Sequence, residues 1–520
     1  MTTPDTSRLR DALDALHQRF AGPGGVAGVV HEGRIVAARA WGHADLTARR
    51  PMTAATRLPI CSITKQFTCG VLLSRLGEPE GFDHRVRAFL PDFEGPLPRL
   101  RQLCDNQSGL RDYWALSILH GALAEQTFRR EDALPLIGRM KSGHFAPGTG
   151  YSYSNGNFRI LAEIIEAETG EDLAALYAEH IWRPAGMKTA TLTADTRRPA
   201  DDVTGYEGTP ATGFFPAENG IFWIGDAGIS AALDDMLAYE CWIDATRDDP
   251  DALYARLSRP PVFADGTPAR YGFGLGHDTV AGLPTTGHGG ALRGFRAHRI
   301  HAAAARLSVV VMFNHEADAR GAAREVMEAA LDHAPAATAA PPPGWEGQWI
   351  CPETGLLARI LRDGDTLKLH YATGAQALTQ VSGGGIGAPG VTLHREGEAL
   401  RMRREGEHLE TLMQPLPAVT AGDREAIAGV YESAELGARL TVEARDGALA
   451  AWCAGMLGQG RIEPVHPVGQ DTWILATRRS MDAPAPGDWT LRARRDAGGR
   501  VDGLTVGCWL ARGIDYRRVG

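Results

Sequence analysis

The strongest constraint on the fold is a break in sequence pattern at residues 334–343, a run made only of Ala, Thr and Pro. Proline fixes φ and removes an amide donor, so such a run favours a semi-rigid linker over a helix or strand. Before it, many segments show helical spacing. After it, short alternating segments are separated by turn pairs such as Asp363-Gly364 and Asp446-Gly447. The 520-residue chain therefore divides into a mixed part and a β-rich part.

The first part is expected to place helices against an antiparallel sheet. Leu9, Leu13 and Leu16 recur at helical spacing and predict a first helix, and helices dominate residues 75–260. The Gly- and Pro-rich segment 204–222 is expected to be a long loop near a site. A closing helix is expected at 319–333. Strands are expected at 26–30, 35–41, 271–275, 295–300 and 307–313. We assign this part to one domain, residues 1–333.

The β-rich part repeats itself with a period of about 80 residues. Gly347-Gln-Trp349 leads to Glu353-Thr-Gly355, and in the same way Gly429-Val-Tyr431 leads to Glu435-Leu-Gly437. Two tandem antiparallel β-barrels are the simplest account. The expected division is a linker at 334–344, a first barrel at 345–417 and a second barrel at 418–520.

Ser62 and Lys65 are spaced as a nucleophile and its base. They lie in Pro59-Ile-Cys-Ser-Ile-Thr-Lys-Gln-Phe67, near the start of an apolar segment that indicates the opening turns of a buried helix. Residues three apart share a helix face, which brings the hydroxyl and the amine within reach. A neutral lysine can accept the serine proton, provided that burial lowers its pKa from about 10.4. Taken singly, the tetrapeptide is weak evidence and favours an ordinary helix start.

Two further motifs follow in order and strengthen this interpretation. Tyr153-Ser-Asn155 comes after the turn at 146–150, and His288-Gly-Gly290 precedes the strand expected at 295–300. In isolation, Tyr153 fits a half-buried tyrosine, Asn155 a helix cap and His288 a turn residue. The ordered trio is much more specific than any one of its members.

The trio resembles the three active-site elements of the penicillin-recognising serine hydrolases, which include class C β-lactamases, DD-peptidases and related esterases. This resemblance covers roughly residues 1–333 and implies a multidomain α/β + β protein, with a β-lactamase/transpeptidase-like catalytic domain ahead of the two barrels. The whole chain is more similar still to the D-stereospecific aminopeptidases of that family. The phrases that carry the closer resemblance are Pro59 to Cys69, Asn106 to Trp114, Gly287 to Arg293 and Ser480 to Gly487.

The resemblance implies a role for each motif residue. Ser62 is acylated, Lys65 accepts its proton, and Tyr153 passes the proton to the leaving amine. Asn155 donates to the substrate carbonyl, and the N–H groups of Ser62 and Ala291 form the oxyanion hole.

His288 replaces the lysine that is usual in the wider group. A neutral histidine suits a substrate with a free amine, because a fixed cation would repel it. The loop 478–488 is expected to reach the cleft, where Asp482 pairs with the substrate ammonium.

The implied function is release of a small N-terminal D-amino acid, with D-alanine favoured, from a peptide or amino-acid amide. Alternatives with the same nucleophile are an esterase, a β-lactamase or a DD-carboxypeptidase, and a non-catalytic β-lactam or peptide sensor is a different class. Relatives suggest a homodimer, and β-lactams are candidate inhibitors. Asp226 could face the cleft or cap a helix, and Gly276 stands where a relative carries asparagine, which puts leaving-group polarity in doubt.

Composition bears on compartment and partners. The chain is 44% hydrophobic with a net charge of −9, which argues against nucleic-acid binding, and its apolar runs are too short to span a membrane. The amphipathic N-terminus lacks a signal-peptide core, and seven scattered cysteines suit reduced thiols. We therefore expect a cytoplasmic protein. The histidines show no metal-ligand spacing, so neither a metal nor another cofactor is expected.

Overall fold

The computed structural model describes residues 6–334, 339–419, 424–477, 479–483 and 486–520. Part of the predicted linker (335–338) and positions 478 and 484–485 of the predicted cleft loop lie outside these residues. Within the described ranges, no helix combines the length and the apolar character required to cross a bilayer.

The N-terminal half is built on an eight-stranded antiparallel sheet. Both faces of its centre are buried, which suits a continuous run of apolar and β-branched residues such as Val309, Val310 and Val311. In spatial order the strands are β3 (Arg50–Pro51), β2 (Arg34–Asp45), β1 (Gly24–His31), β13 (Leu307–Phe313), β12 (Phe295–Ala302), β11 (Leu283–Leu292), β10 (Leu275–Val280) and β9 (Tyr271–Gly272).

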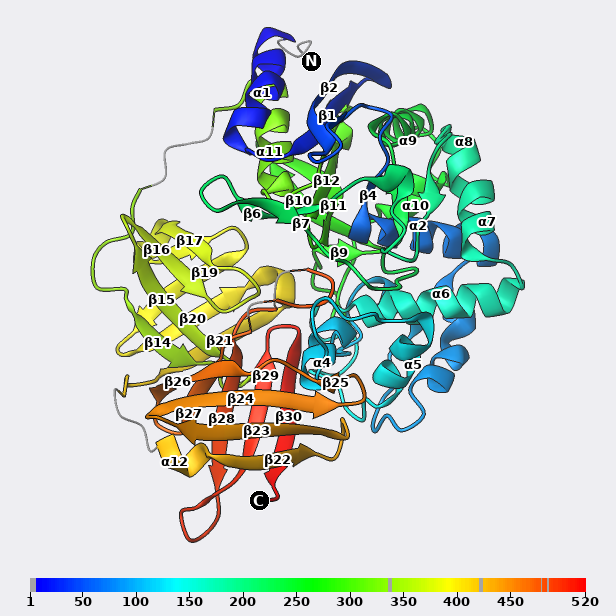
Figure 1. The fold of residues 1–520 in the computed structure, drawn as a ribbon. Coiled ribbons are helices and arrows are strands. Elements are labelled where there is room, and N and C mark those ends of the chain that lie inside the picture. The colour runs from blue at the N-terminus through cyan, green and yellow to red at the C-terminus, as the bar shows by residue number, and fades with distance from the viewer. Residues whose placement is uncertain (1–5, 335–338, 420–423, 478, 484–485) are drawn as a thin grey trace.

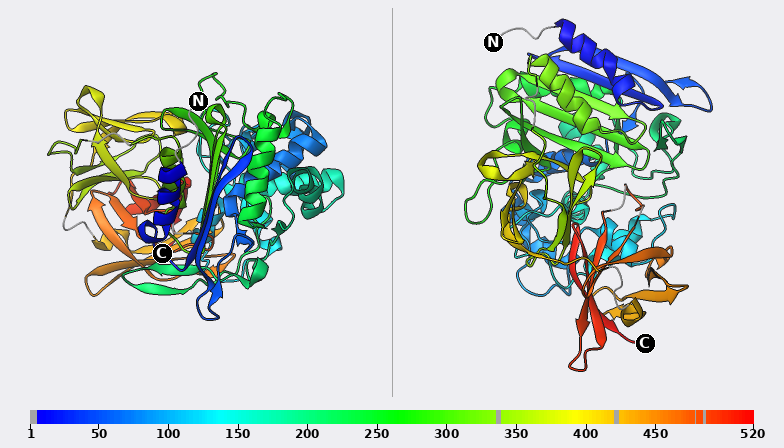
Figure 2. Two further views of the ribbon diagram at one scale, coloured as in Figure 1. Left: turned by 90° about the horizontal axis from the view of Figure 1, so that it is seen from above. Right: turned by 90° about the vertical axis from the view of Figure 1, so that its left-hand side faces the viewer.

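Helices cover both faces of this sheet (Figures 1 and 2). The first and last helices, α1 (Thr6–Arg19) and α11 (Ala319–Ala330), share one apolar cluster on the outer face. The other face carries the inserted helical region and its separate core. Its helices are α2 (Thr64–Val71), α3 (Leu100–Cys104), α4 (Tyr113–Leu119), α5 (Arg130–Gly138), α6 (Asn155–Thr169), α7 (Leu173–Tyr177), α8 (Arg183–Ala185), α9 (Leu233–Ala245) and α10 (Leu253–Leu257).

Two local expectations for this half are wrong. The strand predicted at 271–275 is a tight hairpin, because Phe273 (φ 47°) and Gly274 (φ 74°) turn the chain between β9 and β10. The long loop predicted at 204–222 contains a second hairpin, β6 (Tyr206–Thr209) and β7 (Gly213–Pro216). A three-stranded sheet of β4 (Leu58–Pro59), β8 (Ile229–Ala231) and β5 (Thr191–Leu192) was not predicted.

The C-terminal half consists of two closed eight-stranded antiparallel barrels, which confirms the predicted fold class. The first encloses its own apolar core. Its strands are β14 (Gly347–Ile350), β15 (Leu357–Asp363), β16 (Thr366–His370), β17 (Gln376–Gln380), β18 (Ile386–Ala388), β19 (Val391–Glu396), β20 (Ala399–Arg404) and β21 (Leu409–Pro415).

The second barrel closes through pairing of β23 with β24 and shares a continuous core with the inserted helical region. Its strands are β22 (Gly429–Ser433), β23 (Ala438–Arg445), β24 (Ala448–Gly455), β26 (Glu463–Gly469), β27 (Thr472–Leu475), β28 (Trp489–Arg495), β29 (Val501–Cys508) and β30 (Ala511–Arg518). The short α12 (Arg424–Ile427) precedes it and β25 (Gly458–Gln459) extends its edge.

Both barrels dock on the N-terminal half around α4. Asp112 donates its backbone N–H to the Leu510 carbonyl (2.9 Å), and buried Arg111 pairs with Glu435 (2.8 Å). From the first barrel, His408 bonds the Thr149 carbonyl through Nδ1 (3.0 Å). All three units therefore meet beside the loops that carry the sequence motifs.

Candidate active site

Ser62 lies in a single 3-10 turn (Cys61–Ile63) that leads directly into α2. The α-helix itself begins only at Thr64, so Ser62 lies in the turn ahead of it and not in its opening turns. The turn is fixed by the Ile60 N–H, which donates to the Ile229 carbonyl at 3.0 Å, beside the β4–β8 pairing. Cys61 just before the serine has a left-handed backbone (φ 51°), a strained conformation for a residue with a Cβ.

Lys65 points back along this turn to the serine. Its Nζ lies 2.9 Å from Ser62 Oγ, 2.7 Å from Asn155 Oδ1 and 2.7 Å from the Asp226 carbonyl oxygen. The side chain is fully buried, and this burial lowers its pKa to about 8, although the nearby Asp226 and Asp112 carboxylates oppose the shift. A lysine with such a pKa is partly neutral near pH 7–8, so it can accept a proton.

Asn155, the first residue of α6, is held in one orientation by Asp112. The Asp112 Oδ1 accepts from the Asn155 backbone N–H (2.7 Å) and from its Nδ2 (2.9 Å), which turns Oδ1 of the amide toward Lys65. Asp112 also caps α4 through Ala115 N (3.2 Å). Asn155 thus binds Lys65 and has one amide hydrogen already engaged, leaving its second for any substrate contact.

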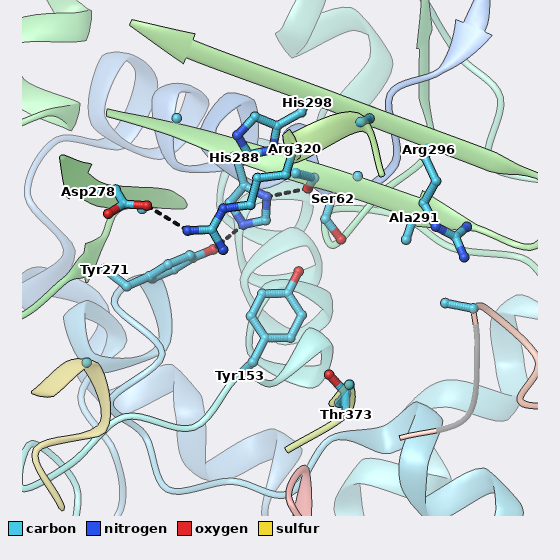
Figure 3. Close-up of a pocket in the computed structure, with 18 of the residues that line it drawn as sticks. Ser62, Tyr153, Tyr271, Asp278, His288, Ala291, Arg296, His298, Arg320 and Thr373 are labelled. Carbon is cyan, nitrogen blue, oxygen red and sulfur yellow. Dashed lines mark hydrogen bonds and ion pairs between the residues drawn. The ribbon is translucent and has the colours of Figure 1, made fainter. Parts of the chain in front are cut away.

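Tyr153 projects into the cavity just before α6 (Figure 3). Burial raises the pKa of its phenol well above the ordinary value, and a hydrogen bond with Ser62 opposes that rise. Lys65 Nζ lies 5.0 Å from the centroid of the Tyr153 ring. The resting phenol is therefore protonated, and it borders both the serine and the lysine.

His288 is neutral and has both ring nitrogens occupied. Its motif lies within β11 and, as predicted, directly precedes a strand, β12. The Nδ1 lies 2.5 Å from the Gly289 carbonyl, which can only accept, so the proton is on Nδ1 and Nε2 accepts from the Tyr271 hydroxyl at 2.9 Å. Burial, with a contribution from nearby Lys65, lowers the His288 pKa to about 3. Figure 3 shows both contacts.

Ala291 places a backbone N–H opposite Ser62. Leu292 and Phe295 close a two-residue hairpin as a hydrogen-bonded pair, so the Ala291 N–H points away from β12 toward the free edge of β11. That edge packs on the nucleophile turn so closely that a Cβ on Gly290 would lie 2.2 Å from the Ile60 carbonyl oxygen. Glycine at 290 is therefore required for the approach.

Asp482 of the second barrel reaches the same place. Its carbonyl accepts from the Arg293 N–H (2.9 Å) at the end of β11, and its carboxylate accepts from Ser480 Oγ (2.9 Å). Burial raises the pKa of the carboxyl group. Arg479 anchors this segment by pairing with Glu207 at 2.8 Å and with Glu125.

One cavity of about 1060 Å³ connects these groups. Its walls include the predicted residues Ser62, Tyr153, Asn155, His288, Ala291 and Asp482, while Lys65 lies buried behind Ser62. Sequence reasoning missed Asp112 and Tyr271, and it missed the first barrel, which contributes Thr373 and Gln376. The one sequence signal for Asp112 was its position in the segment Asn106 to Trp114, which carried the family resemblance.

The remaining candidates lie close by. Asp226 takes neither of its two expected places: it is fully buried outside the cavity walls and does not cap α9, and its carboxylate accepts from the Tyr113 hydroxyl (2.9 Å). Gly276 lines the cavity. Among the residues that the structure describes, no group of three or more His, Cys, Asp or Glu side chains is arranged to hold a metal ion.

Comparison with known proteins defines the class. Residues 9–333 match the family described as Beta-lactamase. The fold aligns with the octameric penicillin-binding protein homologue from Pyrococcus abyssi (TM-score 0.55, 18% identity, 79% of this chain and 100% of that chain). It also aligns with the D-amino acid amidase from Ochrobactrum anthropi SV3 complexed with D-phenylalanine (TM-score 0.51, 18% identity, 62% and 99%). The fold and the serine–lysine pair define a β-lactamase-like serine hydrolase.

Full-length relatives narrow this class. Residues 338–517 match the domain described as D-aminopeptidase, domain B. A D-aminopeptidase of Cereibacter sphaeroides is 64% identical over 99% of this chain and 100% of its own length, and one of Brucella canis is 49% identical over 100% of each. The chain belongs to the D-aminopeptidase family.

Proposed function

We propose that this protein releases a small N-terminal D-amino acid, with D-alanine preferred, from peptides and amides through an acyl-enzyme on Ser62. The observation that carries the proposal is the 2.9 Å contact between Lys65 Nζ and Ser62 Oγ, in a cavity that Asp482 borders. The names and full-length identity of the relatives support the same activity.

The acylation step follows from the protonation states. Neutral Lys65 takes the Ser62 proton as Oγ attacks the substrate carbonyl, and the Ser62 and Ala291 N–H groups stabilise the oxyanion. The Tyr153 phenol gives its proton to the leaving amine and regains one from protonated Lys65. Hydrolysis runs the same transfers in reverse with water as the nucleophile.

Substrate selection rests on groups along the second half of β11. Asp482 offers a carboxylate to the substrate ammonium near Arg293, and neutral His288 in the middle of the strand adds no opposing cation. The segment 479–483 also narrows the acyl side of the cavity, which favours a small terminal residue such as alanine.

A four-substrate panel tests the proposal. D-alanine p-nitroanilide, its L-isomer, a chromogenic ester and a chromogenic cephalosporin are each compared with the Ser62→Ala variant. We expect rapid cleavage of the D-anilide, little of the L-isomer, and loss of turnover in the variant. Turnover of the cephalosporin instead of the D-anilide would identify a β-lactamase. Slow labelling of Ser62 by a β-lactam is compatible with the proposal, because the label would inhibit cleavage of the D-anilide. Labelling without any turnover would indicate a sensor.

We also carry forward the domain limits 1–333, 345–417 and 418–520 as a proposal, with 334–344 as the linker. The support is the spacing between elements, since α11 ends at Ala330, β14 starts at Gly347, β21 ends at Pro415 and β22 starts at Gly429. Limited proteolysis should cut first at 334–344. Cleavage within a barrel before that linker would contradict these limits.

A cytoplasmic homodimer is the proposed working form. Seven free thiols suit a reducing compartment, and the dimer rests on the family resemblance alone. Light scattering coupled to gel filtration tests the dimer, and cell fractionation separately tests the compartment. A monomer, or recovery outside the cytoplasm, would contradict them.

A further inference from the structure

The direction of a bound substrate along β11 follows from the proposed function, on which this inference rests. The Asp482 backbone is fixed at Arg293, beyond Ala291, and His288 lies three residues back along the same strand. A substrate whose amine contacts Asp482 and whose carbonyl lies at Ala291 therefore directs its leaving group past His288 toward β10.

The cavity has room for a leaving amino acid there. Its volume of about 1060 Å³ slightly exceeds the range for drug-sized ligands, about 300–1,000 Å³. Beyond His288 the walls include Asp278 of β10 and Arg320 in the first turn of α11. Figure 3 shows the Asp278 and Arg320 side chains and the ion pair between them on the side of the cavity that carries Tyr271.

Arg320 supplies the positive charge at this end. His288 is neutral with both nitrogens bonded, so the third motif itself provides no cation. Arg320 lines this cavity, and its partner Asp278 lies on β10 two residues beyond Gly276, which pairs with Gly287 next to His288. The group thus faces the space that the leaving residue would occupy.

The present partner of Arg320 can be exchanged. Its Nη2 bonds Asp278 Oδ2 at 2.6 Å, but the two side chains are 66% and 39% exposed. Exposed ion pairs of this kind contribute little, about 0–1 kcal/mol, and are screened by salt. A guanidinium also carries five N–H donors in a planar fork that fits a carboxylate. One carboxylate cannot use all five, so donors remain for a second one.

We propose that Arg320 is a specificity-determining residue that binds the C-terminal carboxylate of the leaving amino acid. The preferred substrates are then dipeptides with a D-residue first and a free carboxylate on the second, rather than amides or longer peptides. Asp278 holds the guanidinium in place and competes with that carboxylate.

The test compares D-alanyl-glycine, D-alanyl-glycinamide and D-alanine p-nitroanilide with Arg320→Met. We expect kcat/KM for D-alanyl-glycine to fall roughly 10-fold, mainly through KM, because a charge-assisted hydrogen bond is lost. The amide and the anilide should stay within about twofold, and Arg320→Lys should recover part of the loss. Asp278→Asn should lower KM for the dipeptide alone.

Arg39→Met is the matched control. Arg39 pairs with Asp14 at 2.5 Å, with the side chains 38% and 57% exposed, and neither residue lines the cavity. The Arg39→Met substitution should leave kcat/KM for all three substrates unchanged. An equal loss on the dipeptide and the amide in Arg320→Met, or no loss on either, would overturn the proposal for Arg320. Failure of the wild-type protein to cleave the anilide would instead contradict the proposed function.

Discussion

Lys65 carries the proposed chemistry because the fold surrounds its amine with three oxygen acceptors and no solvent. Each acceptor comes from a different element: the nucleophile turn, the start of α6 and the segment before β8. Burial lowers the pKa of Lys65 to about 8, and the same burial raises the pKa of the Tyr153 phenol, which keeps it protonated. One environment thus prepares a base and an acid beside one hydroxyl.

The pH dependence of acylation should report on Lys65. The neutral amine is the active form, so kcat/KM for an uncharged chromogenic ester should rise about tenfold per pH unit below pH 8 and level off above it. His288→Asn is the control, since a histidine with a pKa of about 3 does not titrate in this range. An inflection near pH 6.5 that disappears in His288→Asn would contradict this assignment.

Asp112 acts on the site through Asn155 rather than by contact with the nucleophile. Burial, and then the charge of Asp482, raise the pKa of this carboxyl group to about 7. Three N–H donors still hold it in place. We regard it as a positioning residue, because two of these contacts hold Asn155, whose amide in turn binds Lys65.

Among the elements, the contact of β11 with the nucleophile turn decides the geometry. β10 pairs with β11 from Leu283 to Gly287, which leaves the following residues of β11 free to face Ser62. Gly290 permits the approach because the Ile60 carbonyl occupies the space of a side chain. The proposed oxyanion hole therefore depends on the absence of a side chain at Gly290.

Gly290→Ala should lose both activity and stability. Overpacking against backbone costs about 1–3 kcal/mol, and a displaced Ala291 N–H should reduce kcat by about 100-fold. Turnover of D-alanine p-nitroanilide and thermal unfolding measure the two effects. Gly276→Ala is the control for stability, since its Cβ would meet the Gly287 oxygen at 3.4 Å, an ordinary contact. A Gly290→Ala variant with the wild-type kcat would contradict the proposed oxyanion hole.

The sequence predicted those elements whose pattern is local. The apolar run 307–313 matches β13 because both of its faces are buried, and the repeat in the second half gave two barrels. The pattern could not place Ser62 in a turn ahead of α2, since a 3-10 turn and a first helical turn share the same spacing. Nor could it separate β9 from β10, because Phe273 in a left-handed conformation is set by tertiary packing.

The sequence predicted the site motifs but not their supports. Tyr271 bonds His288 from the neighbouring hairpin, and Thr373 lines the cavity from the first barrel. Neither has a motif of its own, because each role depends only on where the completed fold brings the residue. The same holds for Arg320, which the sequence places in an ordinary amphipathic helix.

At the scale of the whole molecule, the second barrel completes the cleft. Arg479 pairs with Glu125 and Glu207, two carboxylates of the N-terminal half, and the adjacent Asp482 is bonded to the end of β11. Buried Arg293 also bonds Glu125 (3.5 Å), so the segment joins a network of charges rather than a single pair. The segment is thus held at the site from both sides.

Asp482→Ala should change specificity more than stability. Loss of the carboxylate should lower kcat/KM for D-alanyl anilides about 10- to 100-fold. The kcat/KM for N-acetylated analogues should rise relative to that for the anilides, because these analogues carry no ammonium that needs a partner. The ratio of the two substrates is the readout, with thermal unfolding as the check on folding. An unchanged ratio would count against a role for this loop in recognising the amine.

The most direct measurement of the central claim is peptide mass mapping after rapid acid quenching of the protein with D-alanine p-nitroanilide. The account predicts one alanyl group on the peptide that contains Ser62, absent with the L-isomer and in Ser62→Ala. An alanyl group on another residue, or continued turnover by Ser62→Ala, would contradict it.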